Sequence, residues 1–242
     1  MEYYSQYGQD RFIDEYVFGQ STGGFFVDIG AHNGVSLSNT LAFEKFRGWD
    51  GICIEPMPER FAQLQANRKC RCVNGCIAPT SGIQRFTMVR GDADMLSGLS
   101  ASFDEDHRQR IEAELRAKGG KQEVIDVQGY AFNELMEKSG VTRIDYCSID
   151  TEGSEFEILQ SMDFQRFGAV CYSIEENGHF MQMRRFLRPR GYRLVEKIGQ
   201  DLVFVQEQKA TSMPRVGFLK PGAFSVRVAQ ALARRLMRVI SR

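Results

Sequence analysis

Hydrophobic runs alternate with amphipathic stretches along most of the chain. Runs with the length and composition of buried strands cover residues 24–29, 51–55, 71–77, 144–150 and 169–175. Apolar residues at three- and four-residue spacing predict helices over residues 36–46, 58–68 and 180–187, and a further helix that begins near Gly153. Strands that alternate with helices predict a parallel sheet with crossover helices on its faces.

Two parts of the chain depart from this alternation. Residues 192–197 and 202–206 predict an antiparallel hairpin that ends the sheet. In the middle of the chain, strands at 84–89 and 123–127 flank a polar segment, residues 90–102, and a charged helix, residues 104–118. We expect the polar segment to be mobile, because long irregular segments in compact domains are usually lids or binding loops.

The first two strands end in acids beside a glycine turn. The first strand runs through Asp28 to a turn with Gly30 and Gly34, and the second ends at Glu55. Carboxyl ends of parallel strands are where open α/β sheets bind ligands. Glycine lets a ligand approach the main chain, while the two acids offer acceptors for an amino group and for a pair of ribose hydroxyls. The pattern predicts a nucleotide-type pocket.

The details favour S-adenosylmethionine over a dinucleotide. The close glycine triplet that holds a pyrophosphate is missing, and Asp28 would repel a phosphate. Glu55 lies 27 residues beyond Asp28, farther than the usual ribose-binding acid of dinucleotide folds. A cofactor with an α-amino group and no phosphate fits Asp28 better. The alternative is that Gly30 and Gly34 merely shape a strand-to-helix turn.

Three stretches resemble the FkbM family of methyltransferases. They are Ser5 to Asp10 (SQYGQD), the segment FFVDIGAHNGVSLSNTLAFEK with the following WDGICIEP, and IDYCSIDTEGSEFEIL. The closing hairpin is also similar, so the resemblance covers residues 5–206. It implies a class I methyltransferase fold, a Rossmann-like seven-stranded α/β sheet that is mostly parallel with a C-terminal antiparallel hairpin. It further implies S-adenosyl-L-methionine as the donor and O-methylation of a sugar, glycan or natural-product hydroxyl.

The expected donor site follows from these motifs. The N-terminal segment from Ser5 to Asp10 is polar on nearly every side, and we interpret it as a cover over the pocket. His32 is either a base, a contact for the donor carboxylate, or a support of the loop. The expected cofactor-binding residues are Gln9, Asp28, Gly30, Ala31, His32, Asn33, Gly34, Asn39, Thr40, Glu55 and Pro56.

Three acids at later strand ends are the candidate catalytic residues. Asp150 ends the fourth core strand, Glu152 follows two residues later, and Glu175 ends the fifth. A carboxylate there could remove the acceptor proton as the methyl group transfers. Asp150 could instead cap the following helix. The three acids could also hold Mg²⁺, which some O-methyltransferases use to acidify a hydroxyl, although no metal ligand is assigned.

Length and composition bound the remaining possibilities. The 242 residues suit a methyltransferase domain over 1–207 and a basic tail over 208–242 that is helical from about 223. Six cysteines without a framework pattern favour a reducing cytoplasm, and the spacing of Cys70, Cys72 and Cys76 does not suit zinc. No secretory signal or membrane-spanning run stands out, so we expect a soluble or peripheral protein.

The tail and the charge pattern determine which partners we expect. The whole chain is neutral, with 31 basic and 31 acidic residues, but the tail carries eight basic residues and no acids. An acidic body argues against nucleic acid as the substrate. The amphipathic tail could lie on the inner face of an anionic membrane, or dock on its own domain or on a second copy in a homo-oligomer.

Two other functions compete with methyl transfer to a small-molecule or glycan acceptor. A degenerate methyltransferase fold could survive as a binding module without catalysis, although Asp28, Glu55 and Asp150 are all present. A nucleotide-dependent oxidoreductase is disfavoured because its fingerprint is missing.

Overall fold

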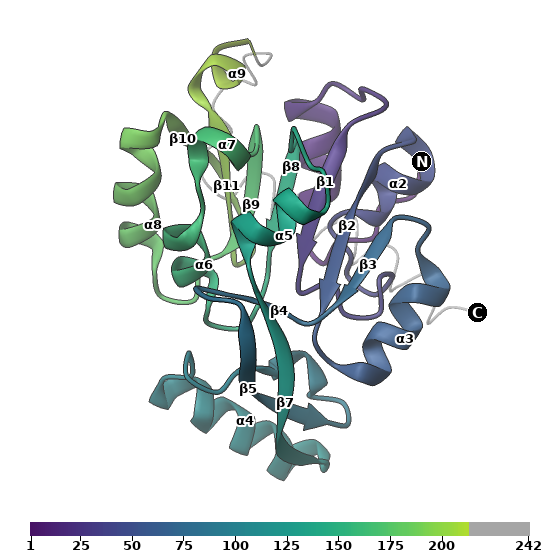
Figure 1. The fold of residues 1–242 in the computed structure, drawn as a ribbon, viewed down its shortest axis with the longest axis vertical. Coiled ribbons are helices and arrows are strands. Elements are labelled where there is room, and N and C mark those ends of the chain that lie inside the picture. The colour runs from purple at the N-terminus through teal and green to yellow at the C-terminus, as the bar shows by residue number, and fades with distance from the viewer. Residues whose placement is uncertain (213–242) are drawn as a thin grey trace, which may run out of the picture.

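The computed structural model describes residues 1–212, which form a seven-stranded sheet and a smaller four-stranded sheet (Figure 1). The larger sheet has the order β10-β11-β9-β8-β1-β2-β3. Its strands are β1 (Phe25–Ile29), β2 (Asp50–Glu55), β3 (Arg71–Asn74), β8 (Tyr146–Ile149), β9 (Cys171–Glu175), β10 (Tyr192–Ile198) and β11 (Asp201–Gln206). The strand β11 runs antiparallel to both of its neighbours, β9 and β10, and the remaining pairs of this sheet are parallel. This arrangement confirms the expected class I methyltransferase fold.

Helices cover both faces of this sheet, because successive strand residues point to opposite sides. Val27 and Ile29 join the core beneath one set of helices, whereas Phe26 joins the core beneath the other. The first set is α5 (Phe132–Lys138), α6 (Glu155–Ser161), α7 (Phe164–Phe167) and α8 (Phe180–Leu187). The second set is α1 (Gln9–Phe12), the π-helical turn η1 (Ile13–Val17), α2 (Leu41–Arg47) and α3 (Pro58–Asn67). The sheet is therefore buried on both sides, as its continuous apolar strands predict.

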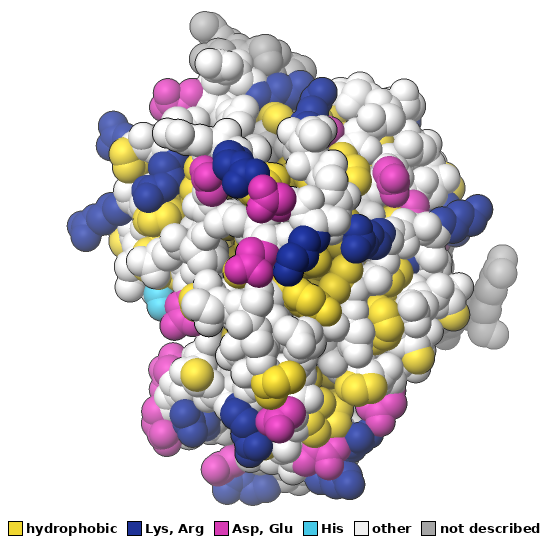
Figure 2. All heavy atoms as spheres, in the orientation of Figure 1, with side chains coloured by type: hydrophobic (Ala, Val, Ile, Leu, Met, Phe, Trp, Pro, Cys, Tyr) yellow, Lys and Arg dark blue, Asp and Glu magenta, His cyan; other side chains and the backbone are white. Residues whose placement is uncertain are grey.

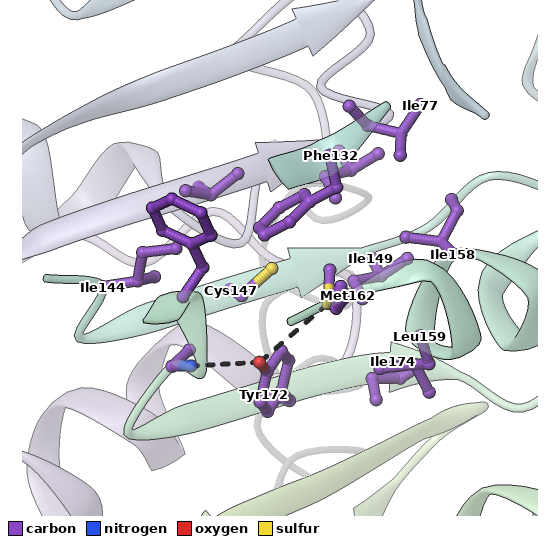
Figure 3. Close-up of a cluster of buried hydrophobic side chains, with 14 of the residues drawn as sticks. Ile77, Phe132, Ile144, Cys147, Ile149, Ile158, Leu159, Met162, Tyr172 and Ile174 are labelled. Atoms are coloured by element: carbon purple, nitrogen blue, oxygen red, sulfur yellow. Dashed lines mark hydrogen bonds between the residues drawn. The ribbon is translucent and has the colours of Figure 1, made fainter. Parts of the chain in front are cut away.

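The core under α5 and α6 is closely packed around the middle strands (Figure 3). Cys147 and Ile149 of β8 lie in the cluster with Phe132 and Ile158 from the covering helices. The Tyr172 hydroxyl accepts a hydrogen bond from the Ala169 amide at 3.0 Å. Fully burying one large apolar side chain contributes about 1.5–3 kcal/mol, so this layer fixes the positions of the strand ends.

A second, smaller sheet is inserted between β3 and β8, in the order β4-β7-β5-β6. Its elements are β4 (Cys76–Ala78), β5 (Gly82–Arg90), the 3₁₀ turn η2 (Asp94–Leu96), β6 (Gly98–Leu99), α4 (Glu105–Lys118) and β7 (Lys121–Ala131). The helix α4 lies along this sheet at one end of the molecule (Figure 1). Ile111 of α4 packs with Val89 and Phe103 in a separate small core.

The strand expected over residues 71–77 is wrong as a single element. It divides at Gly75 into β3, which pairs with β2, and β4, which pairs with β7 of the other sheet. Gly75 has φ +149°, and a Cβ there would lie 2.3 Å from the backbone oxygen of Gln128. The close approach of β7 causes the break, and a hydrophobic pattern does not reveal such a contact.

The helix expected over residues 36–46 begins only at Leu41. Two side chains bond the backbone of the preceding residues and compete with helix formation. Asn33 Oδ1 accepts hydrogen bonds from the amides of Val35 and Ser36, and Ser38 Oγ accepts one from the amide of Leu41. The glycine turn is therefore longer than the sequence suggested.

The remaining predicted elements are confirmed in part. The charged helix and the helix over 180–187 are confirmed, as is the closing hairpin. The segment 90–102 is not irregular throughout, since η2 and β6 fall within it and β6 pairs with β5. Within residues 1–212, no helix is both long and apolar enough to cross a bilayer. The chain leaves β11 through α9 (Glu207–Ser212), and the helix expected from about 223 lies outside the described residues.

Candidate active site

A cavity of about 950 Å³ opens at the carboxyl ends of β1, β2, β8 and β9. It is lined from both sheets and from the N-terminal segment, where Gln6, Tyr7 and Gln9 contribute. Such a volume is within the range of small-molecule sites. The expected donor residues that line it are Gln9, Asp28, Gly30, Ala31, His32, Asn39, Glu55 and Pro56.

Three of the expected cofactor-binding residues, Asn33, Gly34 and Thr40, do not line the cavity. They contact the residues and the loop that surround it. Asn33 holds the loop through the amides of Val35 and Ser36, and Thr40 hydrogen-bonds Asp28. Gly34 has φ +76°, and a Cβ there would lie 2.6 Å from Leu64. These contacts support the residues that face the cavity, and direct contact of Asn33, Gly34 and Thr40 with a cofactor stays a prediction.

The glycine at position 30 serves the protein's own packing. It has φ +88°, and a Cβ would lie 1.7 Å from the backbone oxygen of Asp150. The amides of Gly30 and Ala31 both donate to the Ile54 carbonyl at 3.0 Å. The turn therefore joins the ends of β1, β2 and β8. These contacts support the alternative in which Gly30 shapes the strand-to-helix turn.

Asp28 is buried with one carboxylate oxygen engaged. Thr40 Oγ1 donates to its Oδ2 at 2.6 Å, and Arg68 in turn donates to Thr40 Oγ1 at 3.0 Å. Burial raises the pKa of Asp28, while the positive charge of Arg68 opposes the rise. No described residue donates to Oδ1, which leaves it available to a cationic or amino group of a ligand.

Arg68 also brings Glu44 of α2 into contact with the glycine turn. Arg68 Nε donates to Glu44 Oε2 at 2.7 Å, and its Nη1 donates to the Gly34 carbonyl at 3.3 Å. One guanidinium thus connects α2, the glycine turn and Asp28.

Glu55 occupies the neighbouring strand end with both oxygens on backbone amides. His32 N donates to Oε2 and Met57 N donates to Oε1, each at 2.8 Å. Burial raises the pKa of Glu55 to about 7. Each oxygen keeps a second lone pair, so the carboxylate can still accept from a pair of hydroxyls.

The inserted sheet reaches the glycine turn through Asp94 of η2, which sequence reasoning missed. Asp94 Oδ2 lies 3.2 Å from His32 Nε2 and forms an ion pair with Arg60 of α3. Burial lowers the pKa of His32. These contacts favour loop support among the roles considered for His32. The sequence offered only one sign of this role, an acidic residue within the polar segment 90–102, where no helix or strand pattern was recognised.

The three candidate catalytic acids come together on the opposite side of the cavity. Asp150, Glu152 and Glu175 each contribute a carboxylate oxygen, and these lie within 4.8 Å of one another. Asp150 lines the cavity and is accessible to solvent there, although protein atoms surround it closely. Its side chain does not cap a helix, since the residue at the N-cap of α6 is Ser154.

Burial and mutual repulsion shift the titration of this acid cluster, defined as Asp150, Glu152 and Glu175. Burial first, and then the neighbouring carboxylates, raise the pKa of Asp150 well above its usual range and that of Glu152 to about 8. The pKa of Glu175 is also raised, chiefly by burial. Glu152 therefore favours its protonated form at neutral pH, and a positive charge in the cavity would lower the raised pKa values of all three acids.

Residues that the sequence did not assign complete this side. Asp201, at the start of β11, accepts a hydrogen bond from Gln9 Nε2 at 3.0 Å, and burial raises its pKa to about 7. From α4, Arg110 lies 3.4 Å and His107 Nδ1 3.8 Å from Glu152 Oε2. His107 is half-buried, and so is His179, whose ring stacks on Phe156 with centroids 5.8 Å apart.

Asn39 supplies an independent sign of a ligand. Its Nδ2 donates to Ser148 Oγ at 3.0 Å, and its buried Oδ1 has no hydrogen-bond partner among the described residues. A buried acceptor without a partner costs about 1–3 kcal/mol. Because Asn39 lines the same cavity as Asp28, a donor group of a bound molecule would satisfy it.

The order of the strands defines a class I methyltransferase fold. The cavity lies at the carboxyl ends of its parallel strands, where the sequence predicted a ligand site. A family model described as "Methyltransferase FkbM domain" matches residues 28–194. The match covers more than half of the chain, and the protein therefore belongs to the FkbM methyltransferase family.

Solved structures provide further comparisons of the fold. The methyltransferase FkbM from Methylobacillus flagellatus KT is 12% identical, with a TM-score of 0.46 over 76% of this chain and 44% of that one. The METTL16 methyltransferase domain is 12% identical, with a TM-score of 0.44 over 81% and 64% of the two chains. The N-terminal domain of human METTL16 in complex with SAH is 12% identical, with a TM-score of 0.40 over 76% and 62%. The chain thus spans less than two thirds of the length of these structures. A search of curated proteins gave no match.

Proposed function

We propose that the protein is an S-adenosylmethionine-dependent O-methyltransferase that acts on a hydroxyl of a sugar, a glycan or a related metabolite. The observation that carries the proposal is the placement of Asp28 and Glu55 on one side of a single cavity and of the acid cluster on the other. The first pair suits the amino group and the ribose of the donor. The acid cluster offers carboxylates that would take the proton of an acceptor hydroxyl.

The donor fits the residues present. Asp28 Oδ1 and Asn39 Oδ1 are open acceptors for an α-ammonium group, and Glu55 accepts from two ribose hydroxyls. When bound, S-adenosylmethionine supplies an electrophilic methyl group on a positively charged sulfur. The loop from Gly30 to His32, fixed by Glu55 and Ile54, holds the site in shape before the donor binds.

The acid cluster would remove the acceptor proton. The bound donor would supply the methyl group to the acceptor oxygen, its sulfur would keep the electron pair of the broken carbon–sulfur bond, and a carboxylate of the cluster would take the hydroxyl proton. Asp150 is the favoured base, with Glu152 and Glu175 beside it, because the positive donor would lower their raised pKa values. Alignment of the reacting groups contributes about 7–11 kcal/mol and a base about 10²–10⁴-fold.

The charge of the cavity supports an acceptor without negative charge. Eleven carboxylates line it, whereas Arg110 is the single lysine or arginine among the described lining residues. Like charges would repel a phosphate backbone, so nucleic acid and other polyanions fit poorly. A neutral polyol, which carboxylates recognise by hydrogen bonds, fits well.

Calorimetry with S-adenosylmethionine and with NAD tests the donor. Binding of the first and not the second is expected, and tight binding of NAD would favour an oxidoreductase instead. Donor binding without methyl transfer to any of a panel of sugars and glycans would favour the alternative, a binding module that has lost catalysis. Loss of activity in EDTA that Mg²⁺ restores would show that the acid cluster holds a metal ion.

We also propose that the protein acts in the cytoplasm. All six cysteines are free, and five of them are buried in the sheet cores. A reducing compartment suits this arrangement. Cell fractionation with an antibody to the protein tests the proposal, and recovery from an oxidising compartment would contradict it.

A further inference from the structure

One segment of the folded domain carries arginines and no acids. Residues 177–195 contain five arginines without an aspartate or glutamate. They fall on α8, on the following 3₁₀ turn η3 (Arg188–Arg190) and on the start of β10, which is an edge strand of the large sheet.

These arginines share one outward surface. Met181, Arg184, Arg185 and Arg188 follow the i, i+3, i+4, i+7 spacing of a single helix face, and all four are exposed. Met183 and Leu187, on the opposite side, are fully buried in the core. We call the exposed set, with Arg190, the arginine face. Figure 2 shows basic and hydrophobic side chains together at this edge of the molecule, over α8.

The charges of this face are not compensated by the fold. Among residues 1–212, no carboxylate forms an ion pair with Arg184, Arg185 or Arg188, whereas Arg85, Arg116 and Lys138 each have an acidic partner. Met181, which is 47% exposed, lies among these charges. A surface that combines unpaired arginines with an exposed apolar side chain indicates an external partner.

The chain beyond the domain starts beside the same face. The amide of Glu207, at the start of α9, donates to the Gly191 carbonyl, next to η3, at 2.8 Å. From residue 208 onward the sequence adds eight basic residues and no acid. The arginine segment and the tail together hold 13 of the 31 basic residues, and the rest of the chain has 18 basic against 31 acidic residues.

We propose that the arginine face docks on an anionic lipid bilayer. Arginine and methionine together suit a lipid interface, where charges meet head groups and apolar side chains enter the acyl boundary. The tail repeats this mixture, because its apolar residues recur at three- and four-residue spacing between arginines. A polyanion such as RNA would use the arginines but leave the apolar residues in water.

Docking in this way would bring the cavity close to the lipid surface. His179 lines the cavity and directly precedes α8, which carries the arginine face. An acceptor displayed on a membrane would then need to reach only a short distance to enter the site. The docking itself does not depend on which molecule the cavity methylates.

Co-sedimentation of the full chain with vesicles tests the proposal. The vesicles contain phosphatidylcholine with or without phosphatidylglycerol. The variant Arg184→Gln/Arg185→Gln/Arg188→Gln removes three charges from the face. The control Arg85→Gln/Arg116→Gln/Lys138→Gln removes three exposed charges elsewhere. At roughly fivefold per charge near the surface, the first variant should bind anionic vesicles about a hundredfold more weakly, while the control retains most of the binding.

Several results would overturn the proposal. They are equal binding by the wild type and the arginine-face variant, equal binding to vesicles without phosphatidylglycerol, and binding to RNA without binding to vesicles. Hydrogen exchange of the wild-type protein with and without anionic vesicles gives a check that needs no variant. Protection of the backbone of α8 is expected, and unchanged exchange there would also refute docking.

Discussion

The backbones of Gly30 and Asp150 are in direct contact, so the turn at the donor side of the cavity and the acid on the acceptor side are positioned by one another. The amide of Asp150 also donates to the Ile29 carbonyl at 3.0 Å, which ties the end of β8 to the end of β1. A change at one residue must therefore move the other.

Gly30→Ala should disturb both sides of the site. The new Cβ would collide with the Asp150 carbonyl, and a residue with φ +88° is strained with any side chain. We expect a loss of stability about 1–3 kcal/mol larger than in Gly140→Ala, because Gly140 has φ +69° but nothing within 4 Å. Denaturant unfolding of both variants measures the difference. Equal losses of stability in the two variants would mean that the Asp150 backbone can move away from the new Cβ at little cost in free energy.

Glu55→Ala should weaken binding of S-adenosylmethionine at least tenfold. A hydrogen bond to a charged group is worth about 1.5–3 kcal/mol, and the change also leaves the amides of His32 and Met57 without their acceptor. Calorimetry gives the dissociation constant. The exposed Glu134→Ala is the control, and a folded Glu55→Ala protein with unchanged affinity would remove Glu55 from the donor site.

Asp150→Asn should reduce turnover more than donor binding. The amide keeps the size of the side chain but cannot accept the acceptor proton, so methyl transfer should fall by about 10² or more while the dissociation constant of the donor changes little. Single-turnover rates with the acceptor separate the two effects. Wild-type rates in this variant would exclude Asp150 as the base and direct attention to Glu152 or Glu175.

The unliganded protein should lose stability as the pH rises from about 4.5 to 8. Glu152, whose pKa is raised to about 8, and Glu55, whose pKa is raised to about 7, hold protons in the folded state that the unfolded chain releases near pH 4.5. Their stabilising effect is therefore complete below the unfolded pKa and is lost as the pH rises through the folded pKa.

Glu152→Gln should flatten this dependence, since the amide never ionises. One pKa unit corresponds to about 1.4 kcal/mol, so the gain in stability over the wild type should grow steadily as the pH rises from about 4.5 to about 8. Thermal unfolding at pH 5.5 and 8.5, with Glu134→Gln as the control, measures it. A wild-type melting temperature that rises over this interval would contradict the inferred titration of the cluster.

Much of the architecture was predictable from the sequence because it rests on local patterns. The apolar run through Asp28 and the run ending at Glu55 gave both the strands and the acids at their ends. The family motifs placed Asp150 and Glu152 on the same edge. The expected α/β class followed from the alternation of strands and helices and needed no knowledge of contacts.

What the sequence could not give depends on contacts between distant segments. The break at Gly75 reflects the approach of β7, and the role of Asp94 depends on how the inserted sheet lies against the turn at His32. Arg110 reaches Glu152 only because α4 folds back over the cavity. Asp201 begins a strand instead of ending one, and only the antiparallel direction of β11 brings it to the same edge as the other acids.

The hydrogen bond between Gln9 and Asp201 spans 192 residues of the chain. During synthesis on the ribosome, Asp28 and Glu55 can take their places early, but this side of the cavity stays unfinished until the closing hairpin has emerged. The nascent chain would therefore carry an incomplete pocket until β11 has left the ribosome, and contacts of such long range are also the slowest to form. The first and last elements of the domain complete the pocket together, so a ligand that needs this side of the cavity could bind only after the closing hairpin has folded.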